Sequence, residues 1–285
     1  MKKSFFRSAS VGLLGASLRA SALLAICVVL GACGKTEAPA PVSESMPGAE
    51  PPQSAPLIAD AIIAPDRFAG DNEEDLWRQP QAVLEFMGVE PGMNVLDYFA
   101  ASGYYSELLS RSVGPAGSVT VYNNGPYAEF AGAKLTQRFA NNRLPNTKVI
   151  TVPTNELKLE ANSFDGVLFV MAYHDLYWQP KDAKAPLGNP AQVTADLFQA
   201  VKPGGVVVVV DHVAAKGSET VKVVDAMHRI DPEVVKADFT KAGFVFNSES
   251  AALAHPDDDH TKPVFDKEVQ HKTDQFIYSF IKPAQ

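Results

Sequence analysis

Two groups of ionisable residues follow strongly apolar segments of the chain. His174 and Asp175 come shortly after the run 164–171, and His212 comes shortly after the run 206–210. Both runs are continuously apolar, which is typical of parallel strands that are covered on both faces. Because neighbouring parallel strands end side by side, roughly 5 Å apart, we expect the two histidines to lie close together. An imidazole beside a carboxylate can abstract a proton, so His174 is the candidate general base and Asp175 its orienting partner.

Two other interpretations of this cluster remain open. Tyr173, which we place with His212 among the catalytic candidates, also forms an aromatic group with Tyr177 and Trp178. That group can be core packing, in which case His174 is a buried residue that satisfies a hydrogen bond. Alternatively, the nitrogen and oxygen atoms of the cluster are ligands that zinc or manganese accept, although no short motif such as H-x-x-x-H is present. The residues of that metal alternative are His174, Asp175, Asp211 and His212. A solvated loop is the favoured interpretation of the acidic segment 255–260, and we assign no metal to it.

The segment 93–110 contains a second chemical pattern. An apolar run ends near Asp97, a loop of small residues follows at 100–103, and a helix with apolar spacing begins at Tyr104. Small side chains let a ligand approach the backbone N–H groups that open a helix. In open α/β sheets, ligands bind at this edge, outside the carboxyl ends of the strands. We therefore predict a ligand site at this loop.

This segment resembles the first motif of the class I S-adenosylmethionine-dependent methyltransferases, which reads acid-x-Gly-x-Gly-x-Gly. Asp97 takes the acidic position, Phe99 and Ala101 stand at the first two glycine positions, and Gly103 matches the third. The chain is more closely similar to bacterial predicted methyltransferases of unassigned substrate, over about residues 60 to 283. The stretches that carry this likeness are GYYSELLSRSVGP, MAYHDLYW, DHVAAKGS and HRIDP.

The resemblance implies a fold and a cofactor. The expected fold is a three-layer α/β/α Rossmann-like sandwich with a seven-stranded, mostly parallel sheet and an antiparallel last strand at 275–281. The segment 202–205, KPGG, resembles the turn into the family's fifth strand. The expected cofactor is S-adenosylmethionine, and at the end of the second strand two amides stand where the family usually has an acid. The residues expected to contact the cofactor are Asp97, Ala100, Gly103, Asn123 and Asn124.

The first 32 residues are typical of a secretory signal. They carry four basic residues and no acidic residue before the apolar run 20–32, which is too short to span a bilayer as a stable helix. The run ends Leu-Gly-Ala before Cys33, a pattern that resembles a bacterial lipoprotein cleavage site. We predict that residues 1–32 are a lipoprotein signal peptide and that Cys33 is lipidated. An ordinary signal peptide and an uncleaved anchor are the alternatives.

The remaining chain is divided by composition. Residues 33–56 are rich in Pro, Ala, Ser and Glu, which predicts a disordered tether, and 57–285 forms the methyltransferase-like domain with an N-terminal helical segment. Removing the signal's four basic residues from the 25 leaves 21 against 33 acidic residues, a formal charge of −12. This charge argues against a nucleic-acid surface and against a polybasic membrane patch.

These patterns predict methyl transfer from S-adenosylmethionine to a small acceptor, by an enzyme anchored through lipid in the bacterial envelope and facing the periplasm. Two alternatives stay open. One is a non-catalytic envelope lipoprotein that uses the same fold as a ligand-binding module, and the other is a metal-dependent enzyme with its site at His174 and His212.

Overall fold

The computed structural model of the chain describes residues 58–181 and 186–284. The predicted signal peptide, the lipidated Cys33 and the tether lie outside the described residues. Among the helices of these two ranges, none is long and apolar enough to cross a membrane.

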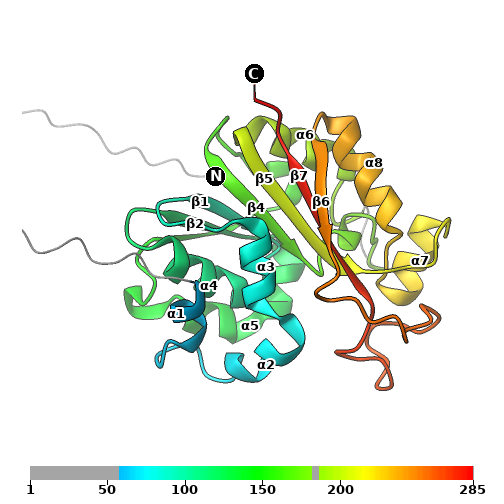
Figure 1. The fold of residues 1–285 in the computed structure, drawn as a ribbon, viewed down its shortest axis with the longest axis horizontal. Coiled ribbons are helices and arrows are strands. Elements are labelled where there is room, and N and C mark those ends of the chain that lie inside the picture. The colour runs from blue at the N-terminus through cyan, green and yellow to red at the C-terminus, as the bar shows by residue number, and fades with distance from the viewer. Residues whose placement is uncertain (1–57, 182–185, 285) are drawn as a thin grey trace, which may run out of the picture. The chain divides into compact units, whose positions relative to one another are not determined.

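A seven-stranded sheet forms the centre of the described domain, in the order β3-β2-β1-β4-β5-β7-β6 (Figure 1). The first five strands pair in parallel, and β7 pairs antiparallel with both β5 and β6. This arrangement confirms the predicted fold. The strands are β1 Asn94–Tyr98, β2 Ser118–Asn123, β3 Thr147–Thr151, β4 Phe164–Val170, β5 Val201–His212, β6 Val245–Ser250 and β7 Gln275–Ile281.

Helices cover both faces of this sheet (Figure 1). Buried residues of α1, α3, α4 and α5 form one hydrophobic core, and buried residues of α6 and α8 form another. The helices are α1 Ile58–Ile63, α2 Asp71–Arg78, α3 Pro80–Met87, α4 Tyr104–Val113, α5 Gly125–Arg138, α6 Pro190–Ala200, α7 Thr220–Met227 and α8 Pro232–Ala242. The short 3₁₀ turns are η1 Ala140–Asn142, η2 Thr154–Glu156 and η3 His174–Leu176.

The valine run of β5 explains how one strand serves two cores. Val207 and Val209 belong to the core under α6 and α8, whereas Val208 and Val210 belong to the core under α1 and α3–α5. Successive side chains of a strand point to opposite faces, so a continuous apolar run is what a doubly covered strand requires. All four valines are fully buried.

Buried ion pairs join the N-terminal helical segment to the body of the domain. The guanidinium of Arg138, at the end of α5, lies 2.5 Å from Asp71 of α2 and 2.6 Å from Glu107 of α4. Arg143 also pairs with Glu107. The three charged groups of the Arg138 cluster are almost completely buried. The helical segment predicted before the first strand is thus fixed to α4 and α5 by charge as well as by apolar packing.

Two element boundaries differ from those predicted. The sequence predicts one helix over 127–143, whereas α5 ends at Arg138. Asn141 and Asn142, beyond that end, take the left-handed conformation that asparagine tolerates. The KPGG segment does not precede its strand but forms an irregularity inside β5. Val201 pairs with Phe164 and Val206 with Gly166, so the strand pairing resumes after the loop.

Candidate functional site

The loop between β1 and α4 has positive φ at the three positions that align with glycines in the family motif, although only one of the three is glycine. Phe99, Ala101 and Gly103 all have positive φ, at 57°, 48° and 82°. Non-glycine residues rarely adopt this region, and each one costs of order 1 kcal/mol or more. A Cβ on Gly103 would also lie 2.9 Å from the Phe139 ring. Gly103 is therefore required both by its backbone angle and by its neighbour.

Hydrogen bonds from the neighbouring strand hold this loop in place. The side-chain amide of Asn123, at the end of β2, accepts from the N–H of Ala101 at 2.9 Å and donates to its carbonyl at 2.9 Å. The N–H of Ala100 donates to the carbonyl of Tyr122 at 3.0 Å. The N–H of Gly103 donates to the carbonyl of Ala100 at 2.8 Å. These bonds offset the free-energy cost of the strained angles, and they occupy the N–H groups of Ala100, Ala101 and Gly103.

Aromatic rings fill the space beneath the loop. The Phe99 ring is buried and stacks on Tyr127 with the ring centroids 4.4 Å apart and the planes 13° apart. Tyr122 lies on a second side of Phe99, with its centroid at 5.6 Å. A glycine at position 99 would leave this volume open. The aromatic side chain thus replaces a space that the family motif keeps free of side chains.

Asp97 lies at the end of β1 and is almost fully buried. Its carboxylate accepts a 2.5 Å hydrogen bond from the hydroxyl of Ser106. Burial raises its pKa to about 6, while the Ser106 bond and the positive charges of Arg78 and Arg138 act in the opposite direction. Asp97 is therefore partly protonated near neutral pH and faces α4.

The fit of these residues to S-adenosylmethionine is mixed. The loop backbone has the conformation of the glycine motif, and the small side chains of Ala100 and Ser102 leave it partly exposed. The side-chain amides of Asn123 and Asn124, however, already form hydrogen bonds within the chain. Asn123 is bonded to the loop, and the side-chain Oδ1 of Asn124 caps α5 by accepting from the N–H of Tyr127 at 3.0 Å. The backbone therefore fits the cofactor, whereas both amides have internal partners.

The second group of predicted residues gathers at the ends of β4 and β5. His174 begins η3, just after β4, and its Nδ1 lies 2.8 Å from Asp211 Oδ1 at the end of β5. The backbone N–H of His174 donates to the other oxygen of Asp211 at 2.9 Å. Both residues are buried. Asp211, rather than Asp175, is thus the carboxylate that orients the His174 ring.

Asp175 takes a different position in the same cluster. Its Oδ2 accepts a 2.6 Å hydrogen bond from the hydroxyl of Tyr127. Its Oδ1 lies 3.3 Å from His174 Nε2 and 3.4 Å from His228 Nδ1, but it has no aligned hydrogen-bond donor. Burial alone would raise the pKa of Asp175, but the neighbouring His174 charge and the Tyr127 hydroxyl hold it below its usual range.

The two histidines of the predicted pair have opposite protonation. Burial acts to lower the pKa of His174, but the charges of Asp211 and Asp175 outweigh it and raise the pKa to about 9. Burial lowers the pKa of His212 to about 3. The ring centroids are 6.3 Å apart, and His212 Nδ1 lies 2.8 Å from the Thr273 hydroxyl. The two rings are neighbours as predicted. His212, however, is hydrogen-bonded to Thr273, which lies just before β7.

The hydroxyl of Tyr173 is hydrogen-bonded to α8 rather than to either histidine. Its hydroxyl donates to Asp238 of α8 at 2.9 Å, and Tyr177 donates to the same carboxylate oxygen at 2.5 Å. Burial and the charge of Asp238 raise the pKa of the Tyr173 phenol well above its usual value. The packing interpretation therefore describes the contacts of Tyr173 and Tyr177, and a catalytic role for Tyr173 stays a prediction.

Two residues of this site did not enter the predicted set. His228 ends α7 in the left-handed conformation and directs Nδ1 to within 3.3 Å of His174 Nε2. Its ring lies between Trp178 and Phe265, with centroids 5.1 and 5.2 Å away. Tyr127, near the start of α5, connects the loop at Phe99 with Asp175. The sequence signal for His228 was its place in HRIDP, one of the stretches that carry the family likeness.

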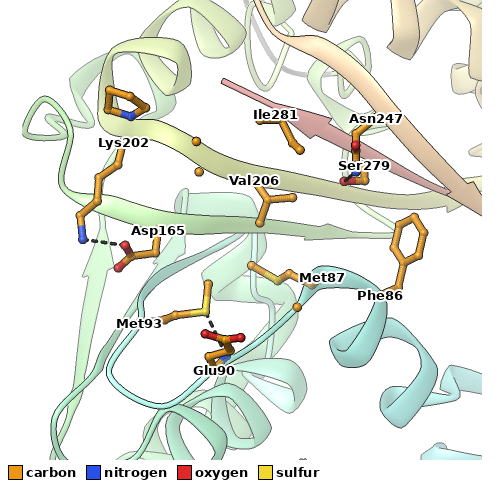
Figure 2. A pocket seen from close by; sticks show the side chains of 14 residues that line it. Phe86, Met87, Glu90, Met93, Asp165, Lys202, Val206, Asn247, Ser279 and Ile281 are labelled. Atoms are coloured by element: carbon orange, nitrogen blue, oxygen red, sulfur yellow. Dashed lines mark hydrogen bonds and ion pairs between the residues drawn. The ribbon is translucent and has the colours of Figure 1, made fainter. Parts of the chain in front are cut away.

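Two pockets among the described residues lie away from the 99–103 loop and from the His174 cluster. Figure 2 shows an open pocket of about 520 Å³ where the parallel strands begin, with the ion pair of Lys202 and Asp165 on its wall at 2.7 Å. A second, much smaller pocket lies beside Tyr98. Neither is lined by Gly103 or His174.

Comparison with known proteins agrees with the sheet order. A crystal structure of an S-adenosylmethionine-dependent methyltransferase from Aquifex aeolicus matches with a TM-score of 0.52 and 18% identity, over 74% of this chain and 94% of that one. The fold is that of the S-adenosylmethionine-dependent methyltransferases. The [4+2]-cyclase SpnF shares it, with a TM-score of 0.54 and 17% identity over 74% of this chain and 82% of that chain. At such identities the likeness shows the fold alone.

Sequence comparison finds a distant methyltransferase. The demethylmenaquinone methyltransferase of Staphylococcus aureus strain JH9 is 28% identical over 138 residues, which is 48% of this chain and 49% of the relative. The chain thus spans about half the length of the curated relatives it matches. No family model matches the chain.

Proposed function

We propose that the chain is an S-adenosylmethionine-dependent methyltransferase that acts on a small acceptor. The observation that carries this proposal is the loop at 99–103. Phe99 and Ala101 keep positive φ where the methyltransferase motif has glycine, although each pays of order 1–3 kcal/mol for that conformation. Strain of this kind persists where the surroundings enforce it, and here Asn123 does so. The fold and the distant methyltransferase relative support the same activity.

The cofactor would supply an electrophilic methyl group. In this proposal it binds beside the half-buried residues Ala100 and Ser102, with Gly103 permitting the close approach. Asp97, Asn123 and Asn124 are the other predicted contacts. For the two amides this means exchanging an internal hydrogen bond for one to the ligand, which lowers the net free energy of binding. We therefore expect weak binding.

The acceptor site is proposed at His174 and Asp175, which Tyr127 connects to the cofactor loop. A pKa of about 9 leaves the His174 imidazole protonated at neutral pH, so there it donates a proton rather than accepting one. A base role for His174 requires the loss of that proton when the acceptor binds. The burial of both residues would exclude water from the reacting groups.

Calorimetric titration with S-adenosylhomocysteine tests the cofactor proposal. The parent protein is expected to bind it, and Gly103→Val is expected to abolish binding, because a side chain there strains the turn and meets the Phe139 ring. Gly92→Val is the matched control, because Gly92 has a similar φ of 83° and open space around it. Gly92 lies just before β1, at the amino ends of the parallel strands, away from the loop. Circular dichroism verifies that both variants are folded. A folded Gly103→Val protein that binds like the parent places the ligand elsewhere.

A second candidate function is a non-catalytic ligand-binding module. It is favoured by the buried Phe99 ring, which fills the space beneath the loop, and by the internal bonds of Asn123 and Asn124. The variant Phe99→Gly separates the two candidates, because it restores the motif glycine and removes the ring. Tighter binding of S-adenosylhomocysteine by this variant supports the methyltransferase. If neither the parent nor Phe99→Gly binds it, the methyltransferase proposal fails and the binding module remains.

The cellular location is a separate proposal that rests on the sequence. The basic and apolar segment 1–32 and the pattern before Cys33 support a lipid-anchored protein of the bacterial envelope that faces the periplasm. A net negative domain offers no polybasic attraction to a membrane, so in this proposal the lipid supplies the attachment.

A further inference from the structure

Three side chains from two distant parts of the sequence bring one possible ligand atom each close to the other two. The atoms are His174 Nε2 and Asp175 Oδ1 of η3 and His228 Nδ1 after α7. The two nitrogens are 3.3 Å apart, and the carboxylate oxygen is 3.3 Å from His174 Nε2 and 3.4 Å from His228 Nδ1. The three atoms thus form a nearly equilateral triangle.

The size of this triangle matches a metal coordination sphere. Zinc binds imidazole nitrogen and carboxylate oxygen at about 2.0–2.2 Å in tetrahedral sites, which puts neighbouring ligand atoms about 3.4 Å apart. The three observed separations have this length. Two imidazoles and one carboxylate are also the donor set of several catalytic zinc and non-haem iron sites. The triangle therefore needs little rearrangement to hold an ion.

The ligand atoms are oriented by groups behind them. His174 Nδ1 lies 2.8 Å from the Asp211 carboxylate, so Nδ1 carries the hydrogen and Nε2 faces the triangle. Asp175 Oδ2 accepts from the Tyr127 hydroxyl, which leaves Oδ1 facing the same way. Metal-binding histidines commonly donate their second ring N–H to a carboxylate in this manner. A plain hydrogen-bonded cluster does not require such a second layer.

The carboxylate oxygen in the triangle supplies the decisive observation. The Asp175 side chain is 12% exposed, but its Oδ1 is buried, and neither imidazole nitrogen beside it is aligned to donate a hydrogen bond. A buried carboxylate oxygen without a donor is costly and calls for an explanation such as an ion. Two properties of His228 agree with this explanation. Its backbone φ is 52°, and its side chain is 21% exposed. The strained backbone directs the ring inward, and the partial exposure gives an ion a path from solvent.

We propose that His174, Asp175 and His228 bind one divalent first-row transition-metal ion, such as zinc. Three protein ligands leave at least one position for water or for a substrate oxygen. The proposal differs from the metal alternative drawn from the sequence, because Asp211 lies behind His174 and His212 is bonded to Thr273. It does not depend on the binding of S-adenosylmethionine. With the ion bound, His174 Nε2 has released its proton and is a ligand, so His174 is then not the base of the proposed methyl transfer.

Zinc titration of chelator-stripped protein tests the site, with the chain purified without a polyhistidine tag. The parent is expected to bind one zinc ion per chain. His228→Asn is expected to weaken binding by 10²-fold or more, and asparagine is chosen because it tolerates the left-handed backbone at this position. His271→Asn is the matched control, since His271 is an exposed histidine with φ of 64°. Its affinity should equal that of the parent.

Two further measurements keep the test decisive if His228→Asn does not fold. Asp175→Asn should weaken zinc binding while circular dichroism shows a folded domain, and cobalt(II) bound to the parent should give visible absorption bands that zinc removes. X-ray absorption of the zinc form should show two imidazole ligands. No zinc or cobalt binding by the parent, or equal affinity in the parent and both site variants, overturns the proposal.

Discussion

The hydroxyl of Tyr127 donates a 2.6 Å hydrogen bond to the buried carboxylate of Asp175. Because the Tyr127 ring also stacks on Phe99, this single side chain connects the glycine-motif loop with the histidine cluster. A ligand that displaces Phe99 or the start of α5 would therefore disturb Asp175 as well. The two halves of the candidate site are mechanically coupled through one residue.

Tyr127→Phe is expected to destabilise the domain by about 1–3 kcal/mol, because a buried carboxylate oxygen loses its donor while the ring stack is kept. Urea denaturation followed by circular dichroism measures this loss. Tyr177→Phe is a suitable control: Asp238 keeps the Tyr173 hydroxyl when the Tyr177 hydroxyl is removed, so a smaller loss is expected. Equal losses in the two variants would show that the Asp175 bond has no special weight.

Asp97 should make stability fall as pH rises between about 4 and 6. Burial raises its folded pKa from 3.8 to about 6, so in this window the folded chain holds a proton that the unfolded chain has released. The full effect is about 3 kcal/mol. Asp97→Asn should therefore gain stability over the parent at pH 7 and lose that advantage near pH 4. The measurement is urea denaturation of both proteins across this range, and a constant difference would contradict the prediction.

Arg138→Met should destabilise the domain by about 3–5 kcal/mol, since it leaves the buried carboxylate of Asp71 without its cation. Glu107 keeps Arg111 and Arg143 as partners, so Asp71 dominates the loss. Lys222→Met removes an exposed cation whose ion pair with Glu219 is 3.9 Å long, and its midpoint should not change measurably. A midpoint for Arg138→Met close to that of the parent would show that water solvates Asp71.

Cys33→Ser should release the protein from the membrane fraction without changing the thermal unfolding of the domain, because the lipid is the proposed attachment. Fractionation of cells followed by immunoblotting measures the release. Cys27→Ser, inside the apolar run, is the control and should leave the protein in membranes. Retention of Cys33→Ser in membranes would count against lipidation at this residue.

Much of the fold was predictable because the strands that form the sheet centre are strongly apolar. The run predicted at 164–171 agrees with β4 to within one residue, and the run 206–210 lies inside β5. The last strand at 275–281, which the family resemblance implied, agrees residue for residue. For the edge strand β6, the sequence predicts a strand only at 244–246. Its residues alternate between exposed and half-buried positions, so its apolar signal ends after Phe246 although the strand continues to Ser250.

The candidate site was predictable only where a strand end fixed the position of a side chain. His174 and His212 end neighbouring strands and are neighbours in the structure. His228 joins them through the left-handed end of α7, a position that strand order does not determine. The internal bonds of Asn123 were equally hidden, because side-chain pairing with a loop backbone leaves no periodic pattern in the sequence.

The position of β7 determines when the sheet can be completed during synthesis. β7 is the last strand in the sequence, yet it lies between β5 and β6, and β6 has no other neighbour in the sheet. Until Gln275–Ile281 emerges from the ribosome, β5 therefore presents an unpaired edge of five valines, and β6 has no strand to pair with. Such apolar edges are templates for wrong pairing, so the nascent chain is most prone to aggregation just before its final strand is made.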